Sequence, residues 1–174
     1  MAWDVCWTWF LLVAMAGCGS VPDVERDPVP LTQTLELRYP VERHDIGYSA
    51  QVSYTFRNGT DAAIRLADCV DDVRPLLQLR RDGRWVDAWH PRLTPCDGPP
   101  LVVEPGASFG DTLNVVGGPP GSNITPAFIF EEIEGVYRLY WFQAALASDS
   151  AVEEAESDID TDWRVSNPFV LAFH

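Results

Sequence analysis

The residues best suited to hold a metal ion lie in an acidic stretch near the end of the sequence. The stretch "DSAVEEAESDIDTDW" carries seven carboxylates, and Asp158, Asp160 and Asp162 alternate within it. This spacing is typical of the opening of a calcium loop, because Ca²⁺ takes several oxygen ligands. Trp163 and Phe169 stand where such a loop needs glycine and a bidentate glutamate. The stretch therefore predicts at most a weak calcium site and no other cofactor, with a solvated acidic loop as the alternative.

A serine motif is the only feature typical of nucleophilic catalysis. Gly106 to Gly110 match G-x-S-x-G with Ser108 at the centre. A nucleophile elbow must lie on a strand-to-helix turn, whereas here Pro105 precedes the motif and the strand-like "DTLNVV" follows it. The three histidines, His44, His90 and His174, are far apart and share no ligand spacing. The sequence therefore predicts a protein that is not an enzyme, and an undetected hydrolase is kept only as an alternative.

Two tryptophans, Trp85 and Trp89, are candidates for a recognition surface. Aromatic residues dominate the energetics of protein interfaces, and the loop "GGPPGSNITP" offers a second exposed element. Tryptophans that alternate along a hairpin arm are also typical of a core. Both interpretations stay open at this point.

The elements that must position these residues are short strands. Residues 48–57 alternate faultlessly, with Tyr48, Ala50, Val52, Tyr54 and Phe56 on one face. The same alternation predicts strands at 35–39, 63–67, 101–103, 108–116, 136–146 (the most apolar and central one) and 169–173. Asp82-Gly83 predicts a two-residue hairpin turn between two further strands. Single helical pieces are expected only around 130–134 and in "SAVEEAES".

Seven to nine short strands separated by Gly, Pro, Asn and Asp predict a single all-β antiparallel sandwich over residues 32–174. The segments "VSYTFRNGTDAAIRL", "VEPGAS", "GVYRLYW" and "SNPFVL" resemble small Ig-like domains of secreted bacterial proteins. They are also similar to β-sandwich proteinase inhibitors of bacteria. The resemblance implies the fold and little about function. No cysteines lie on strands 48–57 and 136–146, so the intersheet disulfide of antibody domains is not expected.

The N-terminal segment resembles a bacterial lipoprotein signal. Residues 5–15 form an apolar run that is shorter than the about 20 residues of a bilayer-spanning helix. Met15-Ala16-Gly17-Cys18 follows the family pattern, which implies a signal peptide over 1–17 and a lipid on Cys18. Residues 18–31 are then a polar, Pro-rich tether. The alternative is that residues 1–18 form a buried first strand.

With Cys6 in the leader and Cys18 lipidated, Cys69 and Cys96 remain as a pair. An exported chain meets an oxidising compartment, which favours one disulfide between them. A metal site is the weaker alternative, because the two cysteines have neither CxxC spacing nor a nearby HxxxH.

Charge excludes one large class of partner. The chain has 26 acidic and 12 basic residues, a net charge of -14, which repels phosphate backbones and predicts no nucleic-acid binding.

Taken together, the signal resemblance and the predicted sandwich lead us to expect a lipid-anchored envelope protein, at the outer membrane, whose domain binds another protein or a surface polymer. The alternative within the same fold is a protease inhibitor that acts through exposed loops.

Overall fold

The computed structural model describes residues 31–66, 74–92, 100–142, 144–146 and 159–174. These ranges contain eleven β-strands and no helix. The strands are β1 (Thr32–Thr34), β2 (Arg38–His44), β3 (Gly47–Arg57), β4 (Ile64–Leu66), β5 (Leu76–Arg81), β6 (Arg84–Trp89), β7 (Leu101–Val103), β8 (Ser108–Gly117), β9 (Gly135–Tyr140), β10 (Ala144–Leu146) and β11 (Phe169–Phe173). The predicted all-β class is confirmed.

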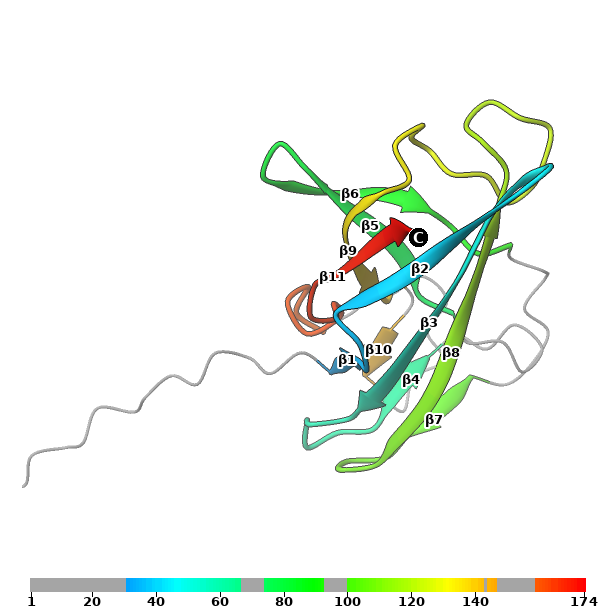
Figure 1. Cartoon of the computed structure of the whole chain (residues 1–174). Coiled ribbons are helices and arrows are strands. Elements are labelled where there is room, and N and C mark those ends of the chain that lie inside the picture. The colour runs from blue at the N-terminus through cyan, green and yellow to red at the C-terminus, as the bar shows by residue number, and fades with distance from the viewer. Residues whose placement is uncertain (1–30, 67–73, 93–99, 143, 147–158) are drawn as a thin grey trace, which may run out of the picture.

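The strands form two packed layers that share β2 (Figure 1). One layer contains β1, β3 and β8, and the other contains β11, β9, β5 and β6 in that order. The C-terminal half of β2 pairs with β3, and its N-terminal half pairs with β11. A separate small sheet has the order β10-β4-β7. The molecule is therefore a β-sandwich in which one strand passes from layer to layer.

The predicted alternation of β3 supplies one wall of the core. Val52, Tyr54 and Phe56 are at most 1% exposed, and β3 pairs antiparallel with β8 along ten residue pairs. Aromatic rings from both layers meet here. The centroid of the Phe56 ring lies 5.4 Å from that of Trp141 and 5.5 Å from that of Phe109. Such contacts stabilise the sandwich beyond the burial of area alone.

The Asp82-Gly83 hairpin forms as predicted between β5 and β6. Both turn residues have positive φ, 49° and 77°, which matches the right-handed twist of the two arms. The turn sets Arg81 opposite Arg84, and the register follows from that pair.

Two details of the predicted sandwich are wrong. The strand count exceeds seven to nine, because β1, β4, β7 and β10 are only three residues long each. The sandwich is also not purely antiparallel, since β2 and β11 run parallel. That pairing arises because β2 crosses to the second layer without reversing its direction.

Three local predictions are also wrong. The strand expected over residues 35–39 is interrupted at 35–37, where Leu35 and Leu37 are exposed and the chain passes between layers. The strand expected at 136–146 divides into β9 and β10, which lie in different sheets. Residues 130–134 form no helical turn but an irregular, bent segment, which is attached to the core by the buried side chains of Phe128 and Ile133.

The predicted signal peptide, tether and disulfide lie outside the described residues, as do Cys18, Cys69, Cys96 and the helix expected in "SAVEEAES". They stay predictions. In the part of the chain that the structure describes, no helix is long and apolar enough to cross a membrane.

Candidate binding surface

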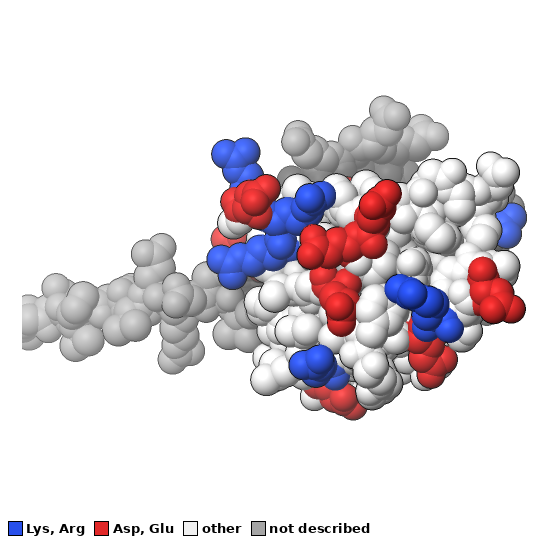
Figure 2. Space-filling view, turned by 45° about the horizontal axis from the view of Figure 1, so that its top comes forward, with Lys and Arg blue, Asp and Glu red and all other residues white. Residues whose placement is uncertain are grey.

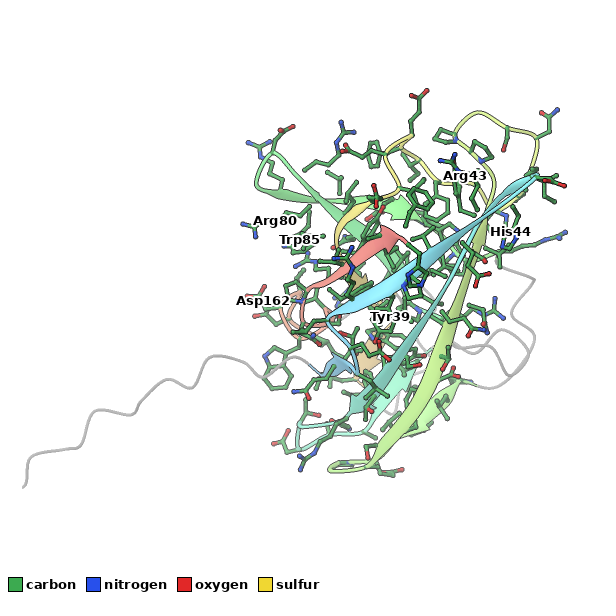
Figure 3. The ribbon with its side chains drawn as sticks, viewed as in Figure 1. Tyr39, Arg43, His44, Arg80, Trp85 and Asp162 are labelled. Atoms are coloured by element: carbon green, nitrogen blue, oxygen red, sulfur yellow. The ribbon has the colours of Figure 1, made fainter. Side chains whose placement is uncertain are left out.

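The outer face of β5, β6 and β9 carries an ordered row of side chains around Trp85. Leu79 and Val86 pair across the hairpin and point to the core, so their neighbours Arg80 and Trp85 point outward. Trp85 is partly exposed. Figure 3 shows Arg80, Trp85 and Asp162 on the same side of the molecule. We call this region the Trp85 surface.

Arg138 on β9 fixes the tryptophan through a cation–π contact. Its guanidinium carbon lies 4.6 Å from the centroid of the Trp85 ring. The Nε of Arg138 donates a hydrogen bond of 2.8 Å to Gln78, and the Gln78 amide donates one of 2.9 Å to Asp87. This chain of contacts crosses three strands. The aromatic ring therefore has a defined contact with the neighbouring strands.

The charge of Arg138 is balanced locally. Partial burial lowers the pKa of the Arg138 guanidinium, and the negative charge of Asp162 opposes that shift. An arginine remains protonated at neutral pH despite such a shift. The Trp85 surface thus presents a positive charge that is partly withdrawn from solvent.

The β5–β6 hairpin carries three further arginines. Arg80 shares the outward face with Trp85, whereas Arg81 and Arg84 pair one position nearer the turn and project to the face of Leu79 and Val86. The guanidinium of Arg81 lies 4.5 Å from the centroid of the Phe130 ring. In Figure 2 arginine side chains gather at the left of the face shown, where the hairpin lies, with acidic side chains between them. The chain as a whole is strongly acidic, so this is a local basic region.

The second candidate tryptophan is not part of any surface. Trp89 is 1% exposed, and its indole N–H donates a hydrogen bond of 3.1 Å to the carbonyl oxygen of Val116. A register shift between Leu77 and Gln78 turns this end of the hairpin, so Trp89 faces the core rather than lying beside Trp85. Its interpretation as a binding residue is wrong.

The predicted calcium residues are only partly described. Asp160 and Asp162 lie in one turn, where the Asp160 carboxylate accepts a hydrogen bond of 3.1 Å from the backbone N–H of Asp162. Asp158 lies outside the described residues. Among those that are described, no three His, Cys, Asp or Glu side chains are grouped as metal ligands would be.

The structure does not bring Ser108 and the histidines together. Ser108 begins β8 and pairs with Arg57, at the far end of β3 from His44. The Nε2 of His90 lies 3.4 Å from the Oδ2 of Asp87, and both side chains are exposed. His174 is the residue after β11. Ser108 also lies in a strand–turn–strand setting, where the backbone differs from that of a nucleophile elbow.

Three residues of the Trp85 surface escaped the sequence analysis. The two-residue turn at Asp82-Gly83 places Gln78 opposite Asp87, so this pair was within reach of the sequence. Arg138 was not, because its neighbours depend on the pairing of β5 with β9, which are about 60 residues apart. No protein-family model matches the chain, and no curated protein matches it.

Proposed function

We propose that this protein is a non-enzymatic binding module that holds another protein or a surface polymer through its Trp85 surface. The observation that carries the proposal is the contact chain from Asp87 through Gln78 and Arg138 to Trp85. Tryptophan and arginine are the residue types that contribute most to binding when they are held rigidly at the centre of an interface.

The chemistry of the surface favours a partner with carboxylates. Arg138 and Arg80 supply positive charge on the face that carries the ring. Arginine donates two parallel hydrogen bonds to a carboxylate, which gives both strength and orientation. An acidic protein segment and an acidic polysaccharide share this chemistry, and the test below distinguishes them.

We further propose that the sandwich is Ig-like. Two features support this. The layers β1-β3-β8 and β5-β9-β11 correspond to the A-B-E and C-F-G sheets of that fold. The Tyr137 hydroxyl, near the start of β9, donates a hydrogen bond of 2.7 Å to the Ile133 carbonyl, as the tyrosine corner of Ig-like domains does.

The proposed location is the bacterial envelope, with a lipid on Cys18 as the anchor. The support is the sequence pattern Met15-Ala16-Gly17-Cys18 after an apolar run. A single acyl chain binds membranes only marginally, and several chains on one residue make attachment stable. Residues 18–31 then give the domain reach from the membrane.

The test is cross-linking of the full chain in native envelopes, followed by identification of what is recovered. The variants are Trp85→Ala, which removes the ring, and Val102→Ala, a control for the loss of an exposed apolar side chain in β7. We expect one dominant partner with wild type and the control and its loss with Trp85→Ala. Digestion with protease or with glycosidase distinguishes a protein from a polysaccharide. Equal recovery with Trp85→Ala would overturn the proposal.

Anchoring and inhibition are tested separately. Cys18→Ser should move the protein from the membrane fraction to the soluble fraction, and an unchanged distribution would contradict the anchor. A general protease assay with added protein tests the alternative, because an inhibitor lowers the rate of proteolysis and a binding module leaves it unchanged.

A further inference from the structure

A polar groove lies beside β3, where β2 leaves its partner strand. Pairing between β2 and β3 stops at Glu42 and Ser49. If the register continued, Pro40 would stand opposite Gln51, and proline has no N–H to donate to the Gln51 carbonyl. The N-terminal half of β2 pairs with β11 instead. The divergence of the two strands leaves a groove with a volume of about 550 Å³.

The groove is lined by neutral polar groups and by two carboxylates. The neutral groups belong to Ser49, Gln51, Ser53 and Asn114. The Gln51 amide donates a hydrogen bond of 3.2 Å to the Asn114 side chain, so this part of the lining is ordered. Glu36 and Glu42 add negative charge, and no lysine or arginine is among the described residues of the lining. We call this feature the acidic groove.

The four most exposed large apolar side chains of the described ranges belong to the groove lining or to chain segments next to it. Leu37 is 74% exposed, Ile46 70%, Leu35 65% and Val116 56%. Val116 lines the groove, Leu35 and Leu37 flank Glu36, and Ile46 lies in the turn between β2 and β3. Single exposed aliphatic residues are ordinary on a surface, but Val116 in the lining together with Leu35 and Leu37 beside Glu36 favours an interface here.

We propose that the acidic groove binds an extended, basic peptide segment of a partner protein. Side chains of an extended peptide alternate in direction, so basic ones can reach the two glutamates while apolar ones cover the aliphatic border. Charge complementarity favours this occupant, because the lining carries only negative charge. An oligosaccharide would leave the exposed aliphatic side chains uncovered. The lining also has no exposed aromatic ring for a sugar, because its aromatic residue, Tyr39, is 3% exposed. The Tyr39 hydroxyl is already used, since it donates a hydrogen bond to the Ser53 carbonyl oxygen.

The test is selection of peptides from a random decapeptide library displayed on phage, with the full chain as the immobilised target. We expect selected sequences to be enriched in arginine or lysine alternating with apolar residues. For the most frequent peptide, the dissociation constant should rise at least about tenfold in the double variant Glu36→Gln/Glu42→Gln, which removes charge with little change of shape.

The matched control is Glu104→Gln/Glu131→Gln, which changes net charge equally at exposed sites outside the lining. This control should bind as wild type does. The peptide should also shift the NMR signals of the Gln51 and Asn114 side-chain amides. The proposal is overturned by failure to select any peptide, by selection of acidic or uncharged sequences, or by equal loss of affinity in both double variants.

Discussion

Asn58 is fully buried just after β3, and its side chain adds hydrogen bonds to the backbone pairing that this residue makes with Gly106 and Ala107. The amide group donates hydrogen bonds of 2.8 Å to the carbonyl oxygens of Ala62 and Val103. The amide oxygen accepts bonds from the backbone N–H and the hydroxyl of Thr60. One residue therefore satisfies the turn after β3 and connects it to β7.

The first prediction concerns this residue. Asn58→Ala should lower the free energy of unfolding by about 3 kcal/mol, because buried donors and acceptors lose their partners together. Chemical denaturation measures the change. Asn114→Ala is the control, since that amide is exposed on β8, and it should stay within about 0.5 kcal/mol of wild type. Equal changes in the free energy of unfolding for the two substitutions would show that the buried hydrogen bonds of Asn58 contribute little to stability.

The hydroxyl of Tyr137 makes stability sensitive to alkali. Burial raises the pKa of Tyr137, and the charge of Glu132 raises it further. The folded state thus keeps a proton that the unfolded state releases above about pH 10. The associated stability is complete below that pH and is lost as pH rises beyond it. Burial also raises the pKa of Tyr39, which adds to the effect in the same direction.

The second prediction follows from that sign. Tyr137→Phe should cost about 1 kcal/mol at neutral pH through loss of the hydrogen bond to Ile133. Above about pH 10 its free energy of unfolding should fall less steeply with pH than that of wild type. Urea denaturation at a series of pH values gives both curves. Parallel curves would mean that this hydroxyl does not control the alkaline response.

Among the elements, the β5–β6 hairpin is the one that holds the Trp85 surface in register. Gly83 has a φ of +77° with open space where a Cβ would lie, so the conformation alone requires glycine. Gly83→Ala should lower the free energy of unfolding by about 1 kcal/mol. Gly59→Ala is the control, because Gly59 also has open space but no positive φ. Thermal denaturation compares them, and an equal change would contradict the role of the turn.

Local pattern was sufficient to predict β3, β8 and this hairpin. In β3 one face enters the core and the other meets solvent, so alternation reports burial directly. At Leu35 and Leu37 the same alternation gives the wrong face, because the chain there passes between layers instead of continuing a strand. Whether these two side chains are buried or exposed depends on which strands β2 pairs with. That information is not contained in any short window of the sequence.

The candidate site shows the same division. Trp85 is outward because it lies two residues from a recognisable turn. In a regular strand Trp89 would lie on the same face as Trp85, because the two residues are an even number of positions apart. The register shift near Leu77 turns Trp89 into the core instead. Arg138 reaches Trp85 only because β5 lies between β6 and β9 in the sheet. A non-local pairing therefore supplies half of the surface.

At the scale of the whole molecule, the two candidate surfaces lie on different strands. The acidic groove is beside β3, and the Trp85 surface lies on β9, β5 and β6 of the second layer, beyond β11 (Figure 3). Along the sheet, Trp85 on β6 is four strand spacings from β2, about 19 Å, and Arg138 on β9 is two spacings from it, about 10 Å. The lining of one site shares no residue with the contact chain of the other. The two proposed sites therefore use different residues.

The last prediction is that the two surfaces act independently. Substitutions more than about 10 Å apart without shared partners add in free energy, so their fold-changes in affinity multiply. Trp85→Ala should leave the affinity of the selected basic peptide unchanged, and Glu36→Gln/Glu42→Gln should leave the envelope cross-link at the Trp85 surface unchanged. The combined triple variant should lose both. If Trp85→Ala weakens the peptide, the two surfaces form one extended interface, and the groove would then recognise a continuation of the same partner.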